Sequence, residues 1–496
     1  MIGTRGFWAT AGAIILAGGL VQAQSSGEVV AKQYDDGSYY EGTFENGRQH
    51  GTGTYRLPNG YEYSGAWVNG VIEGEGTARY TNGSVYVGSF VAGTPHGQGR
   101  ITFADGSSYD GDWDAGQMTG EGRMEYASGQ TYTGGFLNGA YHGTGILEGP
   151  GEFRYDGDWV EGAQTGRARI VYDDGTIYEG DLQDGQRHGQ GRMEMPDGLV
   201  YDGEWQDGQI NGTGVLTQAN GDVYEGTLAN GRREGEGRIA FANGDLYEGN
   251  FHEDRRHGQG MFRSADGFSY EGAWDAGWME GDGQATYADG SVYVGQFHED
   301  AAHGEGTITY EDGGNYQGQW RAGVIEGEGI ARYADGTVYE GSFATGQMHG
   351  QGRMTWPDGY SYDGGWQNGQ REGEAIATYP DGTIYTGAFL AGERHGRGMI
   401  EMADGFRYEG EWANGEMTGE GIATYPSGDV YEGSFVNGRR HGAGELRYAS
   451  GQIVSGLWEE GQFLRLASPA DEGVTDAGDV PEDASEDGSV EGTDQP

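Results

Sequence analysis

The chain has 496 residues, including 103 glycines and only 10 prolines, with 79 acidic residues against 29 basic ones and no cysteine. Glycine without a period of three, together with 12% aromatic residues, excludes a collagen-like chain and a low-complexity disordered chain. A formal net charge of −50 opposes binding to nucleic acid, and the lack of cysteine excludes disulfides, thiolate metal sites and a cysteine nucleophile.

The first 23 residues have the pattern of a secretory signal. Arg5 is the only charge before the apolar stretch 7–21, and small or modest side chains lie at 21 and 23, where a signal peptidase cleaves. We predict a signal peptide over 1–23, cleaved after Ala23, a short linker over 24–33, and an extracytoplasmic mature chain that is periplasmic or secreted. The alternative is an N-terminal membrane anchor, although a span needs about 20 apolar residues.

A Tyr-x-Gly motif recurs every 23 residues and divides the chain into tandem units, whose positions are counted here from the tyrosine. In the unit that begins at Tyr86, residues 86–90 alternate so that Tyr86 and Phe90 share one face of a strand. Residues 99–103 form a second alternating run, 93–97 suggest a long turn between the two runs, and 104–107 suggest a tight Asp-Gly turn. Each unit is therefore expected to be a β-hairpin that pairs with the next one. The motif tyrosines are Tyr40, Tyr63, Tyr86, Tyr109, Tyr132, Tyr155, Tyr178, Tyr201, Tyr224, Tyr247, Tyr270, Tyr293, Tyr316, Tyr339, Tyr362, Tyr385, Tyr408 and Tyr431.

The pattern Y-x-G-x-[FW]-x-x-G-x-x-x-G-x-G, followed by an Asp-Gly turn, resembles the membrane occupation and recognition nexus (MORN) repeat family. The resemblance runs from Tyr40 to about Trp458, including a degenerate last unit that begins at Val454. It implies an all-β fold: an elongated, single-layer, twisted antiparallel sheet of tandem hairpins, open-ended and without a compact globular domain. It also implies a scaffold, an interaction module or a dimerisation array. We assign this array to residues 34–464.

The fifth position of the units alternates between phenylalanine and tryptophan, so the longer repeat is a 46-residue pair. Units of the phenylalanine type carry histidine at the eleventh position, whereas units of the tryptophan type carry Glu, Thr or Asn there. The unit at Tyr224 has no counterpart and shifts the alternation by one unit. We therefore predict two blocks of duplicated pairs with a break near 224–246.

The glycine at the third position lies between two aromatic residues on the same face of the strand. Glycine is normally unfavourable inside a strand. We expect its missing side chain to leave room for the rings of the adjacent hairpin, so that Gly88→Val clashes with them.

Nine of the eleven histidines occupy one position of the unit, which suggests a metal or pH-sensing site. Histidines of alternate units lie about 19 Å apart, four strand spacings, which is too far for one ion. The alternative is a structural role in the turn, with the imidazole hydrogen-bonded to nearby backbone. No metal and no cofactor is predicted.

Acidic residues follow the tyrosine in six successive units and point away from the rings. The functional interpretation is a track for basic partners or divalent cations, and the alternative is a solvated face. The Asp-Gly turns lack the closely spaced ligands of a calcium loop. The acidic row is Asp156, Glu179, Asp202, Glu225, Glu248 and Glu271.

The aromatic face is the candidate binding surface, for an extended peptide, a glycan or a second copy of the array. The alternative is that the rings form the sheet's own one-sided core. Because an open sheet has no second layer, part of this face is then expected to stay exposed or to be covered by a partner. The residues that represent the face are Tyr86, Trp113, Tyr201, Trp205, Trp274, Trp320, Trp366 and Trp412.

No P-loop, HExxH or GxSxG motif is present, and the polar residues recur as turn elements without a single catalytic cluster. We predict a non-enzymatic scaffold for protein–protein interaction or self-association, through the aromatic face and the strand edges. The alternative is an envelope-associated module that binds lipid or glycan, although the charge disfavours membrane association. Residues 465–496 are expected to be an acidic disordered tail, with ten acidic residues after Leu466.

Overall fold

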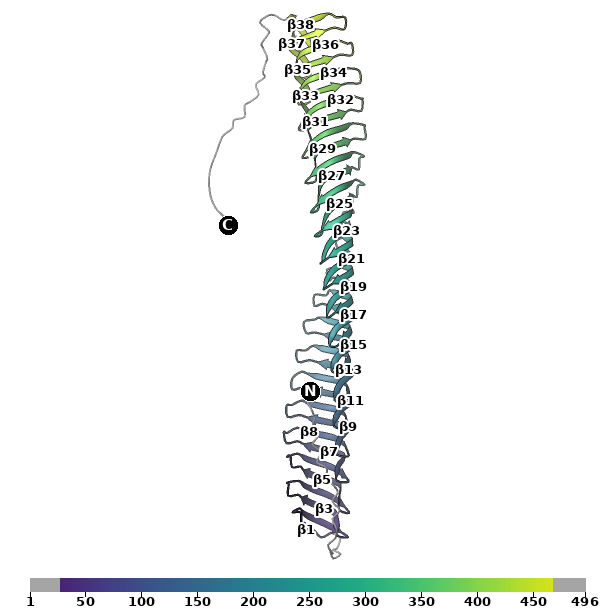
Figure 1. Cartoon of the computed structure of the whole chain (residues 1–496), viewed down its shortest axis with the longest axis vertical. Coiled ribbons are helices and arrows are strands. Elements are labelled where there is room, and N and C mark those ends of the chain that lie inside the picture. The colour runs from purple at the N-terminus through teal and green to yellow at the C-terminus, as the bar shows by residue number, and fades with distance from the viewer. Residues whose placement is uncertain (1–26, 467–496) are drawn as a thin grey trace, which may run out of the picture. The chain divides into compact units, whose positions relative to one another are not determined.

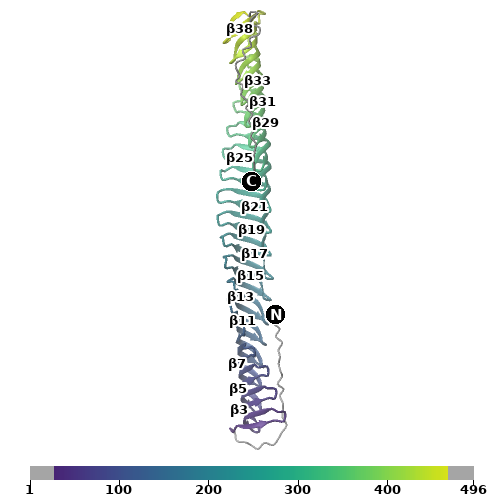
Figure 2. The same ribbon diagram turned by 90° about the vertical axis from the view of Figure 1, so that its left-hand side faces the viewer.

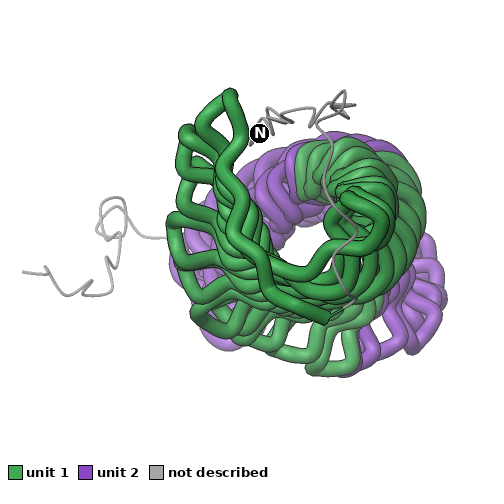
Figure 3. Tube along the Cα trace, turned by 90° about the horizontal axis from the view of Figure 1, so that it is seen from below, with its two compact units in different colours: residues 1–256 green, residues 257–496 purple. Residues whose placement is uncertain are grey.

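The computed structural model describes residues 27–466, so the predicted signal peptide and almost all of the acidic tail lie outside the described residues. The described residues form 39 β-strands in antiparallel ladders and contain no helix. The predicted sheet of tandem hairpins is thereby confirmed. The chain divides into two compact units, residues 1–256 and 257–496, which are drawn in different colours in Figure 3.

The strands of the first unit are β1 (Val30–Gln33), β2 (Tyr39–Glu45), β3 (Arg48–Arg56), β4 (Glu62–Val68), β5 (Val71–Arg79), β6 (Val85–Val91), β7 (Thr94–Thr102), β8 (Ser108–Asp114), β9 (Gln117–Glu125), β10 (Thr131–Leu137), β11 (Ala140–Glu148), β12 (Arg154–Val160), β13 (Ala163–Val171), β14 (Ile177–Gln183), β15 (Gln186–Glu194), β16 (Val200–Gln206), β17 (Gln209–Thr217), β18 (Val223–Ala229), β19 (Arg232–Ala240) and β20 (Leu246–His252). Strand β21 (Arg255–Arg263) spans the division.

The strands of the second unit are β22 (Ser269–Asp275), β23 (Trp278–Thr286), β24 (Val292–His298), β25 (Ala301–Thr309), β26 (Asn315–Arg321), β27 (Val324–Arg332), β28 (Val338–Ala344), β29 (Gln347–Thr355), β30 (Ser361–Gln367), β31 (Gln370–Thr378), β32 (Ile384–Leu390), β33 (Glu393–Glu401), β34 (Arg407–Ala413), β35 (Glu416–Thr424), β36 (Val430–Val436), β37 (Arg439–Arg447), β38 (Ile453–Glu459) and β39 (Gln462–Leu466). In each unit the hairpins follow one another in chain order (Figures 1 and 2).

The turn inside each hairpin is shorter than predicted. Strand β7 begins at Thr94, and only Ala92 and Gly93 connect it to β6. Both residues have positive φ, 51° and 80°, as in the two-residue type I′ turns whose twist matches that of paired strands. The prediction of a long turn over 93–97 is therefore wrong.

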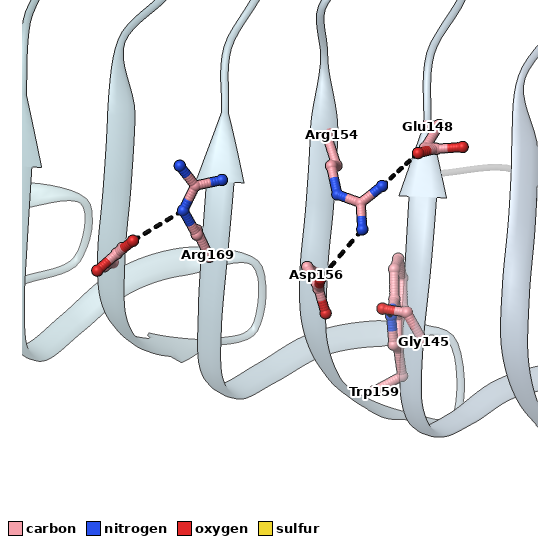
Figure 4. Close-up of polar contacts among 7 residues, drawn as sticks. Gly145, Glu148, Arg154, Asp156, Trp159 and Arg169 are labelled. Carbon is pink, nitrogen blue, oxygen red and sulfur yellow. Dashed lines mark hydrogen bonds and ion pairs between the residues drawn. The ribbon is translucent and has the colours of Figure 1, made fainter.

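Instead of a long turn, the second strand contains an irregularity in which three residues lie opposite one. Gly88 pairs with Gly99 and Phe90 with Pro95, so Ser89 alone lies opposite the three residues 96–98. This bulge recurs in the other hairpins, and extra residues of this kind bend a strand. Figure 4 shows the strands bending where Gly145 and Trp159 lie, and Figure 3 shows that the trace of each unit coils.

The turn between hairpins is the one predicted. The Gly106 N–H donates to the carbonyl of Phe103 at 3.1 Å, and the Phe103 N–H donates to the carbonyl of Ser107 at 2.8 Å. The Asp105 carboxylate accepts from the Ser107 N–H at 2.9 Å. That bond and the bond from the Ser107 hydroxyl, the larger effect, lower the pKa of Asp105. The Asp-Gly sequence thus stabilises its own turn.

The core is a row of tyrosines laid over paired glycines. A Cβ at Gly122 would lie 2.6 Å from the hydroxyl oxygen of Tyr109, and a Cβ at Gly111 would lie 2.5 Å from the Gly122 Cα. The glycines therefore make room for the tyrosine of their own hairpin and for each other's backbone. The expected clash at the third position is supported. The prediction that the ring comes from the adjacent hairpin is wrong.

Residues 30–33, which the sequence assigns to a linker, form β1 and pair with β2. The Val30–Gly42 pair has the register of the Gly53–Gly65 pair two strands further on, so β1 is the end of an incomplete unit. The predicted break near 224–246 stays a prediction, and the β18–β19 ladder there has the usual register.

Candidate interaction surfaces

The eight residues chosen to represent the aromatic face are all buried. Tyr86 and Tyr201 are 0% exposed, and the six tryptophans are between 3% and 9% exposed. The expectation that part of this row stays open is therefore not met for these rings. Because each hairpin bends, rings of neighbouring hairpins close over one another without a second layer. A binding role for the eight residues stays a prediction.

The rings form runs of edge-to-face contacts, which are interrupted where leucine replaces the ring at the fifth position, at Leu182 and Leu228. The ring of Tyr86 lies 5.0 Å from Phe90 in its own hairpin and 5.1 Å from Trp113 in the next, with interplanar angles above 80°. The Trp113 indole N–H donates to the carbonyl of Gly99 at 2.8 Å, and the Tyr86 hydroxyl donates to the carbonyl of Ser89 at 3.0 Å. The polar atoms of these rings are thus satisfied within the chain, as buried aromatic residues require.

Side chains at the tenth position of the unit cover the tryptophans. The Arg187 guanidinium lies 4.3 Å from the Trp205 ring centroid and donates to the carbonyl of Gly208 at 2.8 Å. Arg394 and Arg440 make the same two contacts with the hairpins that follow them. Each of these arginines links two hairpins and closes the face above a tryptophan.

A second aromatic row, at the eighteenth position, is the one that reaches solvent. Tyr333 is 43% exposed, and Tyr287, Tyr310 and Tyr448 are exposed to a similar degree. Each of these tyrosines comes directly before a three-residue segment that ends in glycine, for example Tyr333 before Ala334-Asp335-Gly336. The sequence analysis did not single them out, although a count of aromatic residues at every position of the unit would have found them.

An open groove of about 580 Å³ lies on this side of the first unit. Tyr172 and Met195 of the eighteenth-position row line it, together with Arg187, Trp205 and Ile210. Its lining is largely apolar, with the Asp174 carboxylate and the Arg187 guanidinium as charged groups. It is a shallow surface groove, unlike the enclosed pockets that hold small ligands.

The eleventh position, which carries the histidines, connects neighbouring hairpins. The His96 imidazole lies 3.2 Å from the Asp114 carboxylate of the next hairpin, and His257 lies 3.1 Å from Asp275. In a unit of the other type the Glu73 carboxylate accepts from the turn N–H of Ala92 at 3.0 Å. Histidine and glutamate at this position therefore make the same kind of contact, which connects the bulge of one hairpin to the turn region of the next hairpin.

One contact of the eleventh position shifts the pKa values of both its partners. A hydrogen bond with Glu280 raises the pKa of His298, and the same bond is the largest cause that lowers the pKa of Glu280. No group of three or more His, Asp or Glu side chains that would hold a metal ion occurs in residues 27–466.

The acidic row lies on the outer face, opposite the rings, and its members are exposed. Arginines from the same strand or from a neighbouring strand contact part of it (Figure 4). Arg169 lies 2.7 Å from Glu179, and Arg154 bridges Asp156, at 3.2 Å, and Glu148. The row is therefore less negative than its acidic residues alone suggest.

The repeat itself decides the family. A family model for the MORN repeat matches eighteen consecutive copies, from 40–60 and 63–85 through to 408–430 and 431–453. The chain belongs to the MORN repeat family. The matched repeats form the tyrosine–glycine core, the type I′ turns and the ladders between hairpins that are described above. No curated protein matches the chain.

Solved structures match the chain at low sequence identity and with low TM-scores. The TCP10 domain of Danio rerio CPAP, in complex with a peptide of STIL, is 14% identical, and the match covers 54% of this chain and 93% of that domain with a TM-score of 0.16. The TCP domain of Drosophila melanogaster SAS-4, with a proline-rich motif of Ana2, is 14% identical over 42% of this chain and 96% of that domain, with a TM-score of 0.19. A Staphylococcus aureus virginiamycin B lyase is 12% identical over 75% and 97%, with a TM-score of 0.10. Scores this low support no conclusion about shape or ligands.

Among residues 27–466 of the MORN array, no helix is long and apolar enough to cross a membrane.

Proposed function

We propose that the chain is a non-enzymatic, extracytoplasmic scaffold that binds protein partners, including further copies of itself. The observation that carries this proposal is the repetition of the same exposed rows at one register in successive hairpins. Such rows offer extended surfaces of the size that proteins use, whereas catalysis needs one enclosed cluster of unlike groups. MORN repeats as a family act as scaffolds for protein or membrane interaction.

The eighteenth-position tyrosines and the groove beside them are the surface that we assign to protein partners. Half-exposed tyrosines give a large contact area at low entropy cost and a hydroxyl for hydrogen bonding. The buried tryptophans act as the support beneath this surface. The net charge of −50 favours partners with basic residues.

The rival function is binding of envelope lipid or glycan. Sugar rings usually stack on open aromatic faces, whereas the tryptophans of the fifth position are buried. The acidic chain also repels anionic bilayers. Both observations favour the protein-binding function.

Photo-crosslinking in cells that make the protein tests the proposal. A photoreactive residue at Tyr333, in the exposed tyrosine row, is expected to give discrete protein adducts in the envelope fraction. The same residue at Glu340, exposed on the outer face of β28, the strand that follows Tyr333, is the matched control. Adducts from neither site, combined with binding of the purified chain to neutral glycans or liposomes, would establish the rival instead. A cytoplasmic location on fractionation would contradict the extracytoplasmic part.

A further inference from the structure

Three half-buried arginines lie on the aromatic side of the second unit, at the tenth position of their repeats. Arg371, Arg394 and Arg440 each donate to the carbonyl of a turn glycine in the next hairpin, at 2.6–2.8 Å. Among the described residues none of the three forms an ion pair, whereas Arg439 on the opposite face pairs with Glu460. A guanidinium has five N–H donors, and the described residues accept from only one or two of them in each case. These cations are therefore open to a further acceptor.

The charges beside the exposed tyrosine row differ along the second unit. Burial raises the pKa of Tyr333, and the Asp335 carboxylate raises it further. Burial also raises the pKa of Tyr425, but the charged group that acts on this hydroxyl is Arg440, which lowers the pKa. The Arg440 guanidinium lies 5.8 Å from the Tyr425 ring centroid. The row therefore passes from an acidic environment at Tyr333 to a basic one at Tyr425.

Tyr360, at the twenty-second position, lies close to two of the arginines. The Arg371 guanidinium donates to its hydroxyl at 2.6 Å. Burial raises the pKa of Tyr360, and Arg371 and Arg394 both act to lower it. The ring centroid of Tyr360 lies 4.7 Å from that of Trp356 and 5.1 Å from that of Tyr379. We call Arg371, Arg394 and Arg440, with the rings beside them, the arginine stretch.

The aspartates in the turns of the arginine stretch do not neutralise it by direct contact. Asp358, Asp381 and Asp404 each accept from a backbone N–H of their own turn at 2.9 Å. None of these three aspartates forms an ion pair with the three arginines. Each guanidinium therefore keeps donors for another carboxylate, the group whose planar shape it matches best.

The chain carries an acidic segment close to this surface. Residues 471–494, which lie outside the described residues, contain ten acidic residues and no basic one. Arg440 reaches the carbonyl of Gly461, in the turn between β38 and β39, and only a few residues separate β39 from the first acidic residue of the segment. The segment therefore starts within about one hairpin of the first arginine.

The spacing of the acidic residues matches the spacing of the arginines. Each hairpin advances the sheet by about 9–10 Å, so Arg394 lies two hairpins, about 19 Å, from Arg440, and Arg371 lies about 9–10 Å further. An extended chain advances about 3.3 Å per residue, so these distances need about six residues and then about three. Acidic residues lie at 471, 472, 476, 479, 482 and 483. The steps 471–476 and 472–479 bracket the first distance, and the step 479–482 matches the second.

We propose that residues 471–483 bind along the arginine stretch of their own chain, with carboxylates on Arg440, Arg394 and Arg371 in that order. A short tether gives such a segment an effective concentration in the millimolar range, so weak contacts suffice although the chain as a whole is acidic. The charges that decide the contact lie within a Debye length, about 8 Å at physiological salt. The bound segment covers the tyrosines of the arginine stretch and leaves Tyr333, beside Asp335, open to basic partners.

This inference goes beyond the proposed function by naming an occupant for one part of the tyrosine row. It rests on the proposed function only in treating that row as a binding surface. Because the contact is electrostatic and partly exposed, it is expected to be reversible and to weaken as salt rises.

A disulfide trap in the full chain tests the contact, since the chain has no cysteine of its own. Ser427→Cys lies in the exposed turn beside Tyr425, between Arg440 and Arg394 along the sheet, and is combined with Val474→Cys. Neither substitution changes a charge. Oxidation is expected to close a disulfide within one chain, measured as loss of both thiols without an increase in mass. High salt is expected to slow this closure.

Two triple variants of the trapped chain separate the arginine stretch from general charge effects. Arg371→Met, Arg394→Met and Arg440→Met together are expected to slow closure about tenfold. Methionine already occupies the tenth position at Met348 and Met417, so the fold accepts it there. The matched control removes the same charge from exposed arginines of the outer face and is expected to change the rate less than about twofold. Its substitutions are Arg321→Met, Arg353→Met and Arg397→Met.

Equal closure rates in the two triple variants would overturn the proposal. A closure rate that is independent of salt would do so without relying on any arginine variant. Covalent dimers that increase with protein concentration, in place of closed single chains, would show that the segment of another copy occupies the surface and would also overturn it. Photo-crosslinking from Tyr333 does not depend on residues 471–483, so failure of this contact and failure of the proposed function are distinguishable.

Discussion

The two faces of the sheet differ in how far they vary along the chain. On the aromatic face both units keep the same arrangement: a buried tyrosine over a glycine or alanine, and a buried aromatic or leucine side chain at the fifth position. On the outer face the units diverge. In the first unit the fifteenth position is often arginine facing an acid, as in the Arg192–Asp202 pair, whereas in the second it is often apolar, as at Ile376 and Ile422.

The difference shows which positions the fold constrains. On the aromatic face an added carbon meets backbone or a ring within 3 Å, so packing allows few side chains. On the outer face side chains stand in solvent, where most substitutions change stability by less than about 0.5 kcal/mol. Stability is therefore concentrated on one face, and the other face is available for solubility and contacts. Four predictions test this division, from the largest expected effect to the smallest.

Alkaline pH is expected to unfold the array through the aromatic face alone. Burial raises the pKa of Tyr40 and of Tyr224 from 10.0 to about 12. A raised pKa means that the folded chain keeps protons that the unfolded chain releases, so the free energy of unfolding is full below pH 10 and falls as pH rises toward 12. Far-UV circular dichroism and tyrosinate absorbance at 295 nm are expected to change together. Full tyrosine ionisation with native circular dichroism would contradict the prediction.

Gly88→Val is expected to destabilise its hairpin by about 3–5 kcal/mol, in the range of severe core disruptions. The new Cβ would lie 2.6 Å from the Gln98 carbonyl oxygen and 2.7 Å from the Tyr86 hydroxyl. Hydrogen exchange over residues 85–102 measures the local loss. The control is Arg100→Val, on the outer face of the same hairpin, with an expected change within about 0.5 kcal/mol. Similar effects of the two variants on stability would contradict the predicted difference between the two faces.

Trp113→Phe is expected to cost about 1–2 kcal/mol, because it removes the hydrogen bond to Gly99 and leaves part of the indole volume empty. The same change at Trp278, which is 52% exposed, is the matched control and is expected to be close to neutral. Urea unfolding followed by circular dichroism measures both. A costly change at Trp278 would show that exposure does not decide the effect.

Exchanging the outer-face residues of the two units is expected to have the smallest effect. Arg169→Ile breaks the 2.7 Å contact with Glu179, and Ile376→Arg places an arginine beside Asp363. Exposed ion pairs contribute about 0–1 kcal/mol, so both variants are expected to shift the urea midpoint only slightly, and less at high salt. A loss comparable to that of Trp113→Phe would make the outer face a second stability determinant.

The sequence by itself determined the period, the hairpin unit, the antiparallel pairing of neighbours and the Asp-Gly turn. Each of these depends on local rules: alternation places Tyr86 and Phe90 on one face, and glycine supplies positive φ at Gly106. The family followed from the same regular spacing. The half-exposed tyrosine row at the eighteenth position is also present in the sequence, but it lies outside the motif positions that define the repeat.

Only the tertiary structure decided where the second strand starts, which ring covers which glycine and how deeply the tryptophans are buried. The same sequence is compatible with a two-residue turn followed by a bulge and with a five-residue turn. Pairing with the neighbouring strand selects the two-residue turn. Burial of Trp113 depends on the bend of the strands and on rings contributed by two hairpins, which no single unit specifies. The strand at Val30–Gln33 likewise forms because it pairs with β2. Four residues alone do not form a stable strand.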